Sequence, residues 1–541
     1  MRGVVRSRIL AVLITGAALL LPAHSADAAL ETIVQDDAAL LHRTNEQVRG
    51  SMQKLRSLGV DRVRLTANWS VLTRTPDAKE RPPDFDARDP DAYPQAVWQG
   101  LDDAVRLATE AGLKIMIDIG FWAPRWATSG GPDPRARSHI RASDFADYAV
   151  AVARRYSGTY VPPSLVAPPP PPSQDQSLLD QLLGGPSSGD DPPPVAPKPL
   201  AAVTQFVLWN EPNQPGLLLP QWKGRGTKAK PVSPTVYARM ARAAYPAAKS
   251  QRPEARFLLG NTSSDGGSPP RGAVAPLLFL REIACVNARL RPLKTNRCKR
   301  YKRLPGDGWA HHPYPRQLRP DSLGTYDNPD NVRTAALGRL SKLLRRLIAR
   351  KRISQGLRRI HLTEFGYETA KLPGRPKLTQ AQQARWLTWA EYLSSRVRGV
   401  VSFAQFLLRD LPPGPDRVSP SKARGFGQYY SGLQTAAGKD KLAARSFTAG
   451  LFAARRPRKR VLLWGRLRLG RGVKAISIER RRGSGAWRLL RRLNVDGQDS
   501  FSLRTRYVRR GRYRLRWPLD NGKIAKGLTI APMTPWRPPR K

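Results

Sequence analysis

The chain has 541 residues, 40% of them hydrophobic and 25% charged, so it is long enough for several domains and its composition excludes wholesale disorder. Lysine and arginine number 93 against 41 acidic residues, and the resulting net charge of +52 favours polyanionic partners. Two cysteines exclude a disulfide-scaffold fold and multi-cysteine zinc modules.

Residues 1–28 predict a secretory signal peptide. Three arginines precede an apolar run over residues 9–23, and an Ala-Asp-Ala cleavage site ends at Ala28. An uncleaved anchor is the alternative, but the run is too short to span a bilayer comfortably and no stop-transfer pattern follows. We therefore expect a secreted, extracellular protein, with association to the cell wall as a further option and no membrane attachment after cleavage.

Export affects two further predictions, the state of the two cysteines and the class of binding partner. In an oxidising compartment Cys285 and Cys298 are expected to form a disulfide, which stabilises a loop this short by about 3 kcal/mol. Two buried free thiols are the alternative. Export also argues against a nucleic-acid partner, although the net charge alone would suggest one.

Residues 29–455 alternate short apolar runs with stretches of helical periodicity. This alternation is typical of βα units around a parallel sheet, and eight such runs predict a (β/α)8 TIM barrel, an α/β fold, rather than an open sheet. The expected strands are residues 32–34, 62–67, 114–119, 205–209, 256–260, 308–312, 359–363 and 400–406.

Residues 162–200 interrupt the pattern. They are rich in Pro, Ser, Gly and Asp and cannot bury enough apolar surface to fold, so we expect a disordered insert. Because the insert follows a helix and precedes the fourth strand, it belongs on the N-terminal face of the barrel, opposite the active site. The leucine-rich residues 178–183 within it are either a docking patch or a chance apolar island.

Residues 458–541 have a different pattern, with short alternating runs between turns, and predict a small all-β module, an Ig-like sandwich. This segment holds 25 Lys and Arg against 4 acidic residues, a net charge of +21. Period-2 alternation places several arginines on one sheet face, where they could bind anionic cell-wall polymers bidentately. The alternative is a solvated face. The arginines concerned are Arg466, Arg468, Arg504, Arg506, Arg512, Arg514 and Arg516.

Two glutamates stand where expected strands end. Glu211 follows the apolar run of the fourth strand, and Glu364 follows that of the seventh. In a parallel barrel these ends line the catalytic mouth. Two carboxyl groups across such a mouth are what glycosidic cleavage requires, because one protonates the leaving oxygen while the other attacks the anomeric carbon.

The motifs around the two glutamates, WNEPN over residues 209–213 and TEFGYET over residues 363–369, resemble those of the clan A glycoside hydrolases, the cellulase-like retaining (β/α)8 enzymes. The resemblance covers about residues 30–455. The WNEPNQPG run over residues 209–216 looks closer to the xylosidase-like family 39 than to the true cellulases of family 5, and the branch stays open. The resemblance implies that Glu211 is the acid/base and Glu364 the nucleophile. The third strand ends in Asp118-Ile119-Gly120-Phe121, where many cellulases have a histidine, and this departure makes cellulose a doubtful substrate.

The same resemblance implies further substrate-binding residues. Asn210 matches the asparagine that contacts the sugar 2-hydroxyl, and Arg64 matches the arginine beneath the nucleophile; an arginine inside an apolar strand needs an anionic partner in any case. The alternative for Arg64 is an ion pair at the barrel floor. His312 and Tyr314 match the family's H-x-Y motif, whose tyrosine hydroxyl forms a hydrogen bond with the nucleophile. The alternative is that they are polar residues whose hydrogen bonds are made locally at a strand end.

Aromatic residues follow several strands and predict a platform for sugar rings at the mouth, with Trp69 and Trp122 as substrate-binding residues. Phe121, Trp126 and Trp222 are further candidates, and core or loop packing is the alternative for each. No histidine spacing is convincing for metal ligands, so neither a metal nor a cofactor is expected.

The sequence as a whole predicts a secreted retaining glycosidase that hydrolyses O-glycosidic bonds of a polysaccharide or oligosaccharide. The alternative is a non-catalytic cell-envelope protein that uses a barrel scaffold to bind polysaccharide. An intact pair of glutamates, with Asn210, Arg64 and Tyr314 beside it, argues against a decayed site.

Overall fold

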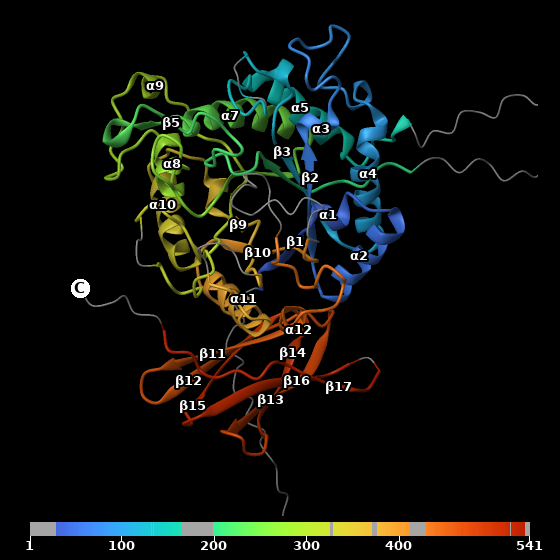
Figure 1. Ribbon diagram of the computed structural model, residues 1–541, viewed down its shortest axis with the longest axis vertical. Coiled ribbons are helices and arrows are strands. Elements are labelled where there is room, and N and C mark those ends of the chain that lie inside the picture. Colours follow the sequence, from blue (N-terminus) through green and yellow to red (C-terminus); the bar gives the residue numbers. More distant parts are fainter. Residues whose placement is uncertain are drawn as a thin grey trace, which may run out of the picture.

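The computed structural model describes residues 29–130, 133, 135–163, 198–324, 328–370, 376–411, 429–519 and 521–535. Eight parallel strands close into a barrel in the order β1-β10-β9-β8-β7-β4-β3-β2, which confirms the predicted fold (Figure 1). Each expected strand overlaps one of them. They are β1 (Glu31–Gln35), β2 (Arg62–Asn68), β3 (Lys114–Gly120), β4 (Gln205–Leu208), β7 (Arg256–Thr262), β8 (Gly308–His311), β9 (Ile360–Leu362) and β10 (Val400–Phe406).

Helices cover the outside of the barrel, and their sequences explain where they begin. Thr44 caps the second helix by accepting from the Gln47 amide, and Thr379 forms a reciprocal capping box with Gln382. The main helices are α2 (Asn45–Ser57), α4 (Gln95–Glu110), α5 (Ala142–Arg155), α7 (Ser233–Gln251), α8 (Pro276–Ile283), α10 (Leu337–Ala349), α11 (Gln380–Ser395) and α12 (Leu442–Thr448). Shorter elements are α1 (Asp37–Leu40), α3 (Trp69–Leu72), α9 (Asn296–Lys299), β5 (Trp222–Lys223) and β6 (Lys230–Pro231).

Alternation along the strands divides the barrel into an outer and an inner layer. Residues that face the helices belong to one large apolar core, whereas a small separate cluster fills the inside of the barrel. The inner cluster consists of Ile33, Met116, Val207, Leu258, Ala310 and Ala404. The inside of the barrel is therefore packed, and chemistry is confined to the rim at the carboxyl ends of the strands.

The C-terminal domain is a sandwich of two antiparallel sheets around its own apolar core. One sheet contains β11 (Ala449–Arg456), β12 (Arg460–Leu467) and β15 (Ser500–Arg506). The other contains β13 (Val473–Arg482), β14 (Arg488–Asp496), β16 (Gly511–Pro518) and β17 (Ile524–Lys526). The expected boundary at residues 455–458 is wrong because β11, which pairs with β12 along its whole length, already belongs to the sandwich.

The sandwich packs on the barrel through arginines that were expected on an open basic face. Arg466 and Arg468 are both 2% exposed. Arg468 donates to Glu391 of α11 at 2.6 Å and to the Thr32 hydroxyl of β1 at 2.9 Å. Burial, together with the neighbouring Arg468, lowers the pKa of Arg466 to about 10. These two residues join the domains and do not contribute to an open basic face.

A second pair from that expected face is also engaged in ion pairs. Arg514 and Arg516 of β16 donate to the two carboxylate oxygens of the buried Glu479 on β13, at 2.6 and 2.8 Å. The paired strands place all three side chains on one face of the four-stranded sheet. Much of their charge is therefore neutralised within the domain.

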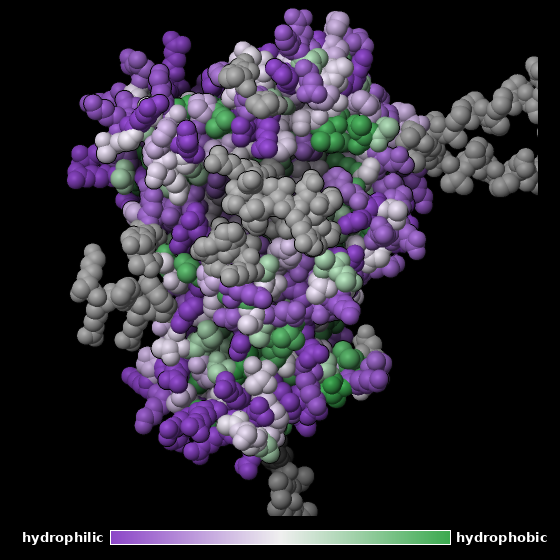
Figure 2. All heavy atoms as spheres, in the orientation of Figure 1, coloured by the Kyte–Doolittle hydropathy of each residue, from purple (hydrophilic) through white to green (hydrophobic). Residues whose placement is uncertain are grey.

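The loop between α8 and β8 is closed by a disulfide between Cys285 and Cys298, whose Cα atoms lie 5.7 Å apart. The expected signal peptide, residues 1–28, and most of the insert 162–200 lie outside the described residues; the ends of the insert fall between α5 and β4. None of the described helices has the length and hydropathy needed to span a bilayer. The face in Figure 2 is mostly hydrophilic, and apolar side chains gather on the sandwich near its junction with the barrel.

Candidate active site

The two glutamates meet at the rim of the barrel. Glu211 lies three residues beyond the end of β4, and Glu364 lies two residues beyond the end of β9. Their side chains are 20% and 11% exposed, and carboxylate oxygens of the two lie within 4.8 Å of each other. Since parallel strands end at the same rim, residues 153 positions apart in the sequence converge on one site.

Glu364 is held by two donors. Arg64 donates from Nη1 to Oε1 at 2.6 Å, and the Tyr314 hydroxyl donates to Oε2 at 3.1 Å. Burial acts to raise the pKa of Glu364, but the charges of His312 and Arg64 and the two hydrogen bonds outweigh it, so the pKa lies below its usual value. Burial and the two nearby glutamates raise the pKa of Tyr314, which keeps its hydroxyl protonated as a donor.

Glu211 contacts a histidine that is itself fixed. His312 Nδ1 lies 2.8 Å from Glu211 Oε1, and Nε2 lies 2.9 Å from Asn261 Oδ1. The Asn261 amide nitrogen donates to the Trp209 carbonyl at 3.2 Å, so its Oδ1 is the acceptor and His312 Nε2 carries a proton. With Nε2 used toward Asn261, Nδ1 is the ring nitrogen that His312 presents to Glu211.

The backbone around these residues is strained. Trp209, Glu211 and Asn261 have φ angles of 71°, 36° and 45°, in the left-handed region that residues other than glycine seldom adopt. The Glu211 amide donates to the Asn261 carbonyl at 3.0 Å, which ties the ends of β4 and β7 together. Strain of this kind persists where the surroundings fix the backbone, and it concentrates at functional sites.

Three residues of the site were not expected from the sequence: Asn261, Asp118 and Gln35. Asp118 accepts from Arg64 Nη2 at 2.5 Å, and Gln35 accepts from Nη1. Burial raises the pKa of Asp118 to about 6 against the opposing charge of Arg64. Two features of the sequence could have indicated these residues. Asp118 is a charged residue inside an apolar strand, of opposite sign to Arg64, and Asn261 is a polar residue near the end of β7.

Asn210 completes the network beneath the two glutamates. Its Oδ1 accepts from Arg64 Nη2 at 3.0 Å and from the Asn261 amide at 2.8 Å. With its oxygen used twice, Asn210 is oriented by residues of two other strands. The structure thus brings Glu211, Glu364, Arg64, Asn210, His312 and Tyr314 into one site.

Two of the aromatic residues expected in the platform, Trp69 and Trp126, lie in the core. Trp69 is fully buried, begins α3 and stacks on Tyr148 of α5 with ring centroids 5.4 Å apart, and Trp126 packs edge-on against it. Both are core residues, because the chain turns back onto the helices directly after β2, so the expectation that Trp69 binds substrate is wrong. Trp122 is half-buried, donates from Nε1 to the Gly216 carbonyl at 3.0 Å and lies under the Arg135 guanidinium.

Glu211, His312 and Glu364 offer ligand atoms that all lie within 4.8 Å, as a metal site would. The donor set fits a cation poorly, since the Arg64 guanidinium lies 2.6 Å from Glu364 Oε1 and repels any metal ion there. Both ring nitrogens of His311 form hydrogen bonds, one with the Thr262 hydroxyl and one with the Val332 carbonyl, which identifies it as a structural histidine. The absence of a metal stays a prediction.

No family model matches the sequence, and no curated protein sequence matches it. Solved structures with a similar fold include GH5_18 from Streptomyces cattleya in complex with GlcNAc, at 16% identity and a TM-score of 0.44, covering 78% of this chain and 79% of that one. Another is the endo-beta-1,4-mannanase from Thermotoga petrophila, at 12% identity and a TM-score of 0.38, covering 94% and 98%. These similarities are similarities of fold, to barrels of glycoside hydrolases.

Proposed function

We propose that the chain is a retaining glycoside hydrolase that cleaves O-glycosidic bonds of a polysaccharide or oligosaccharide by double displacement. The observation that carries the proposal is the pair Glu211 and Glu364, whose carboxylate oxygens lie within 4.8 Å. Retaining enzymes hold their carboxyl groups about 5–5.5 Å apart, whereas inverting enzymes leave about 6.5–9.5 Å for a water molecule. The short separation favours direct attack by one carboxylate.

Glu364 is the nucleophile in this proposal. Its depressed pKa keeps it ionised at neutral pH, and Arg64 and Tyr314 hold one oxygen each, so the carboxylate is oriented before substrate arrives. It attacks the anomeric carbon while the bond to the leaving oxygen breaks, and a covalent glycosyl ester forms. The ester is later cleaved by water, which returns Glu364 as a carboxylate.

Glu211 is the acid/base. The hydrogen bond from His312 Nε2 to Asn261 turns Nδ1 toward Glu211, so His312 orients the carboxyl group whose proton the first step uses. Glu211 gives this proton to the leaving oxygen in the first step and removes a proton from water in the second. Asn210, oriented by Arg64 and Asn261, is placed to bind a hydroxyl of the same sugar.

Export of the enzyme is part of the proposal. The arginines and apolar run of residues 1–28 support it, and so does the disulfide between Cys285 and Cys298, because disulfides persist in oxidising compartments. The substrate is then a glycan outside the cytoplasm. Detection of a mature N-terminus after Ala28 in the culture medium would test this part separately.

The two roles are tested with a panel of aryl glycosides and polysaccharides. Glu364→Gln should abolish turnover of every substrate. Glu211→Ala should slow natural glycosides severely but spare aryl glycosides with acidic leaving groups, and azide should restore its activity as a glycosyl azide, because only poor leaving groups need protonation. Equal loss on both substrate types without azide rescue would refute the role of Glu211. Binding of polysaccharide without any turnover would favour the non-catalytic alternative.

A further inference from the structure

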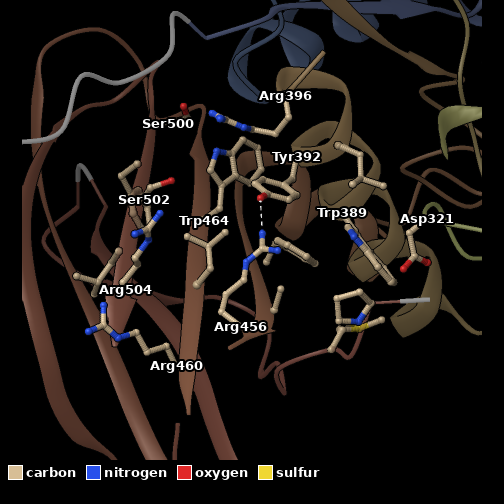
Figure 3. Close-up of a pocket in the computed structure, with 18 of the residues that line it drawn as sticks. Asp321, Trp389, Tyr392, Arg396, Arg456, Arg460, Trp464, Ser500, Ser502 and Arg504 are labelled. Atoms are coloured by element: carbon tan, nitrogen blue, oxygen red, sulfur yellow. Dashed lines mark hydrogen bonds between the residues drawn. The ribbon is translucent and has the colours of Figure 1, made fainter. Parts of the chain in front are cut away.

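A groove of about 1190 Å³ lies between α11 of the barrel and the three-stranded sheet of the sandwich (Figure 3), and neither Glu211 nor Glu364 lines it. Trp389 and Tyr392 of α11 form one wall, and Trp464, Leu462 and Ser502 of β12 and β15 lie on the other. The groove arises because only part of the sheet face packs on the barrel. The rest of the same face is left open.

The open part carries four exposed arginines, Arg456, Arg460, Arg504 and Arg506, which we call the arginine row. In the sheet Arg456 is paired with Arg460, and Arg460 with Arg506, so three arginines stand directly opposite one another on three adjacent strands. Like charges in directly opposed positions lower the stability of a sheet. The opposed arginines of these three strands therefore lower the stability of the sheet, so the stability of the fold does not explain their presence.

Within the described part of the chain, neither Arg460 nor Arg504 nor Arg506 has a carboxylate within 4.0 Å. Asp321 is the acidic residue among those lining the groove, and it pairs with Arg319 at 3.1 Å. Arg456 is held toward the groove by its hydrogen bond to the Tyr392 hydroxyl at 2.8 Å. This contrasts with Arg466 and Arg468, which share Glu391, and with Arg514 and Arg516, which share Glu479.

We infer that the arginine row and its groove form a second, non-catalytic glycan site that binds a polysaccharide bearing carboxylate groups, such as a polyuronate. Guanidinium groups bind carboxylates bidentately. Neighbouring strands are about 4.8 Å apart, close to the length of one sugar ring, so successive acidic sugars of an extended chain can meet successive arginines. The apolar side chain of Leu462, between the arginines, suits the C–H face of a sugar.

The choice of a glycan rests on the proposed function, since the site lies on the same chain as the hydrolase barrel. A single-stranded nucleic acid is less well suited, because stacking of bases requires accessible aromatic faces beside the basic groups. Trp464, Trp389 and Tyr392 are only 5%, 3% and 8% exposed. The exposed residues that line the groove are arginines, Ser502, Pro457 and Pro535.

The test uses the full chain and a triple variant, Arg460→Ser, Arg504→Ser and Arg506→Ser, which spares every residue of the active site. A matched control, Arg482→Ser, Arg488→Ser and Arg492→Ser, removes the same charge from exposed positions on the other sheet. Binding of polygalacturonate, dextran and inorganic polyphosphate is measured by calorimetry or affinity electrophoresis at several salt concentrations. Activity on a small aryl glycoside is measured in parallel, so failure of this site and failure of the hydrolase proposal are distinguishable.

We expect the triple variant to bind polygalacturonate roughly tenfold more weakly, with the control changed less than about twofold and dextran bound by none of the proteins. Hydrolysis of the aryl glycoside should be the same in all three. Equal weakening in the control would show that the attraction is one of net charge and would overturn the inference. Polyphosphate bound as tightly as polygalacturonate would also overturn it, by showing a general polyanion surface.

Discussion

Arg64 and Glu364, which are 300 residues apart, are joined inside the barrel by a hydrogen bond of 2.6 Å between Nη1 and Oε1. The Arg64 side chain is fully buried and donates from Nη2 to Asp118 Oδ2. Two carboxylates thus share one guanidinium, and the neighbouring charges raise the pKa of Arg64. The charge state of the proposed nucleophile depends on His312 and on this arginine.

Replacement of Arg64 should impair both ionisation and catalysis. In Arg64→Met the pKa of Glu364 rises, because burial is no longer opposed by the guanidinium. We expect kcat/KM at pH 7 to fall by about a hundredfold or more, and the loss of activity on acidification to occur at a higher pH than in the parent. A pH–rate profile measures this; an unshifted acid limb would contradict it. Arg49→Met, at an exposed position on α2, is the control.

Asp118 should make stability depend on pH in the acid range. Its pKa is raised from 3.8 to about 6 in the folded state, so the fold binds a proton more tightly than the unfolded chain does. Its contribution to stability is fully present below pH 3.8 and is lost as the pH rises through about 6. Asp118→Asn should therefore gain stability relative to the parent from pH 4 to 6 and show a constant difference above pH 7. Urea unfolding across this range measures it, and parallel curves would refute it.

His361 should change the pH dependence of stability in the opposite direction, so that stability falls as the pH falls. It is buried inside the barrel, both ring nitrogens lack a hydrogen-bond partner among the described residues, and burial lowers its pKa from 6.5 to about 3. The stability that its neutral form contributes is present above pH 6.5 and is lost as the pH falls toward 3, by up to about 1.4 kcal/mol per pH unit.

The variant His361→Leu should reduce this loss on acidification, and the exposed His42→Leu should leave it unchanged. Thermal unfolding at pH 7, 6, 5 and 4 provides the comparison. An equal decline in all three proteins would show that His361 does not titrate with unfolding.

Glu391 should hold the two domains together. It accepts from Arg468 at 2.6 Å and lies 3.5 Å from Arg466, and all three side chains are buried. Glu391→Ala leaves two buried cations without their carboxylate, which should lower stability by about 3–5 kcal/mol. By contrast, Glu110→Ala removes an exposed partner of Arg49 and should cost less than about 1 kcal/mol. Differential scanning calorimetry of the two variants measures both losses of stability. A similarly small loss of stability in both variants would contradict the role of Glu391.

The sequence by itself determined the barrel and the position of its chemistry. Strand–helix alternation predicts eight parallel strands, and all of these end at one rim, so Glu211 and Glu364 could be placed together without coordinates. The sequence also determined that charged Arg64, in an apolar strand, required an anionic partner. These inferences depend on local periodicity and on a rule that holds for every parallel barrel.

Tertiary structure alone decided which neighbours each side chain meets. Period-2 alternation is the same whether a sheet face meets solvent or another domain, so the burial of Arg466 against Glu391 could not be distinguished from the exposure of Arg504. Trp69 follows a strand as a mouth residue would, but the path of α3 turns it into the core. Asn261 reaches His312 only because β7 and β8 are adjacent in a particular register, and register is set by packing across the whole barrel.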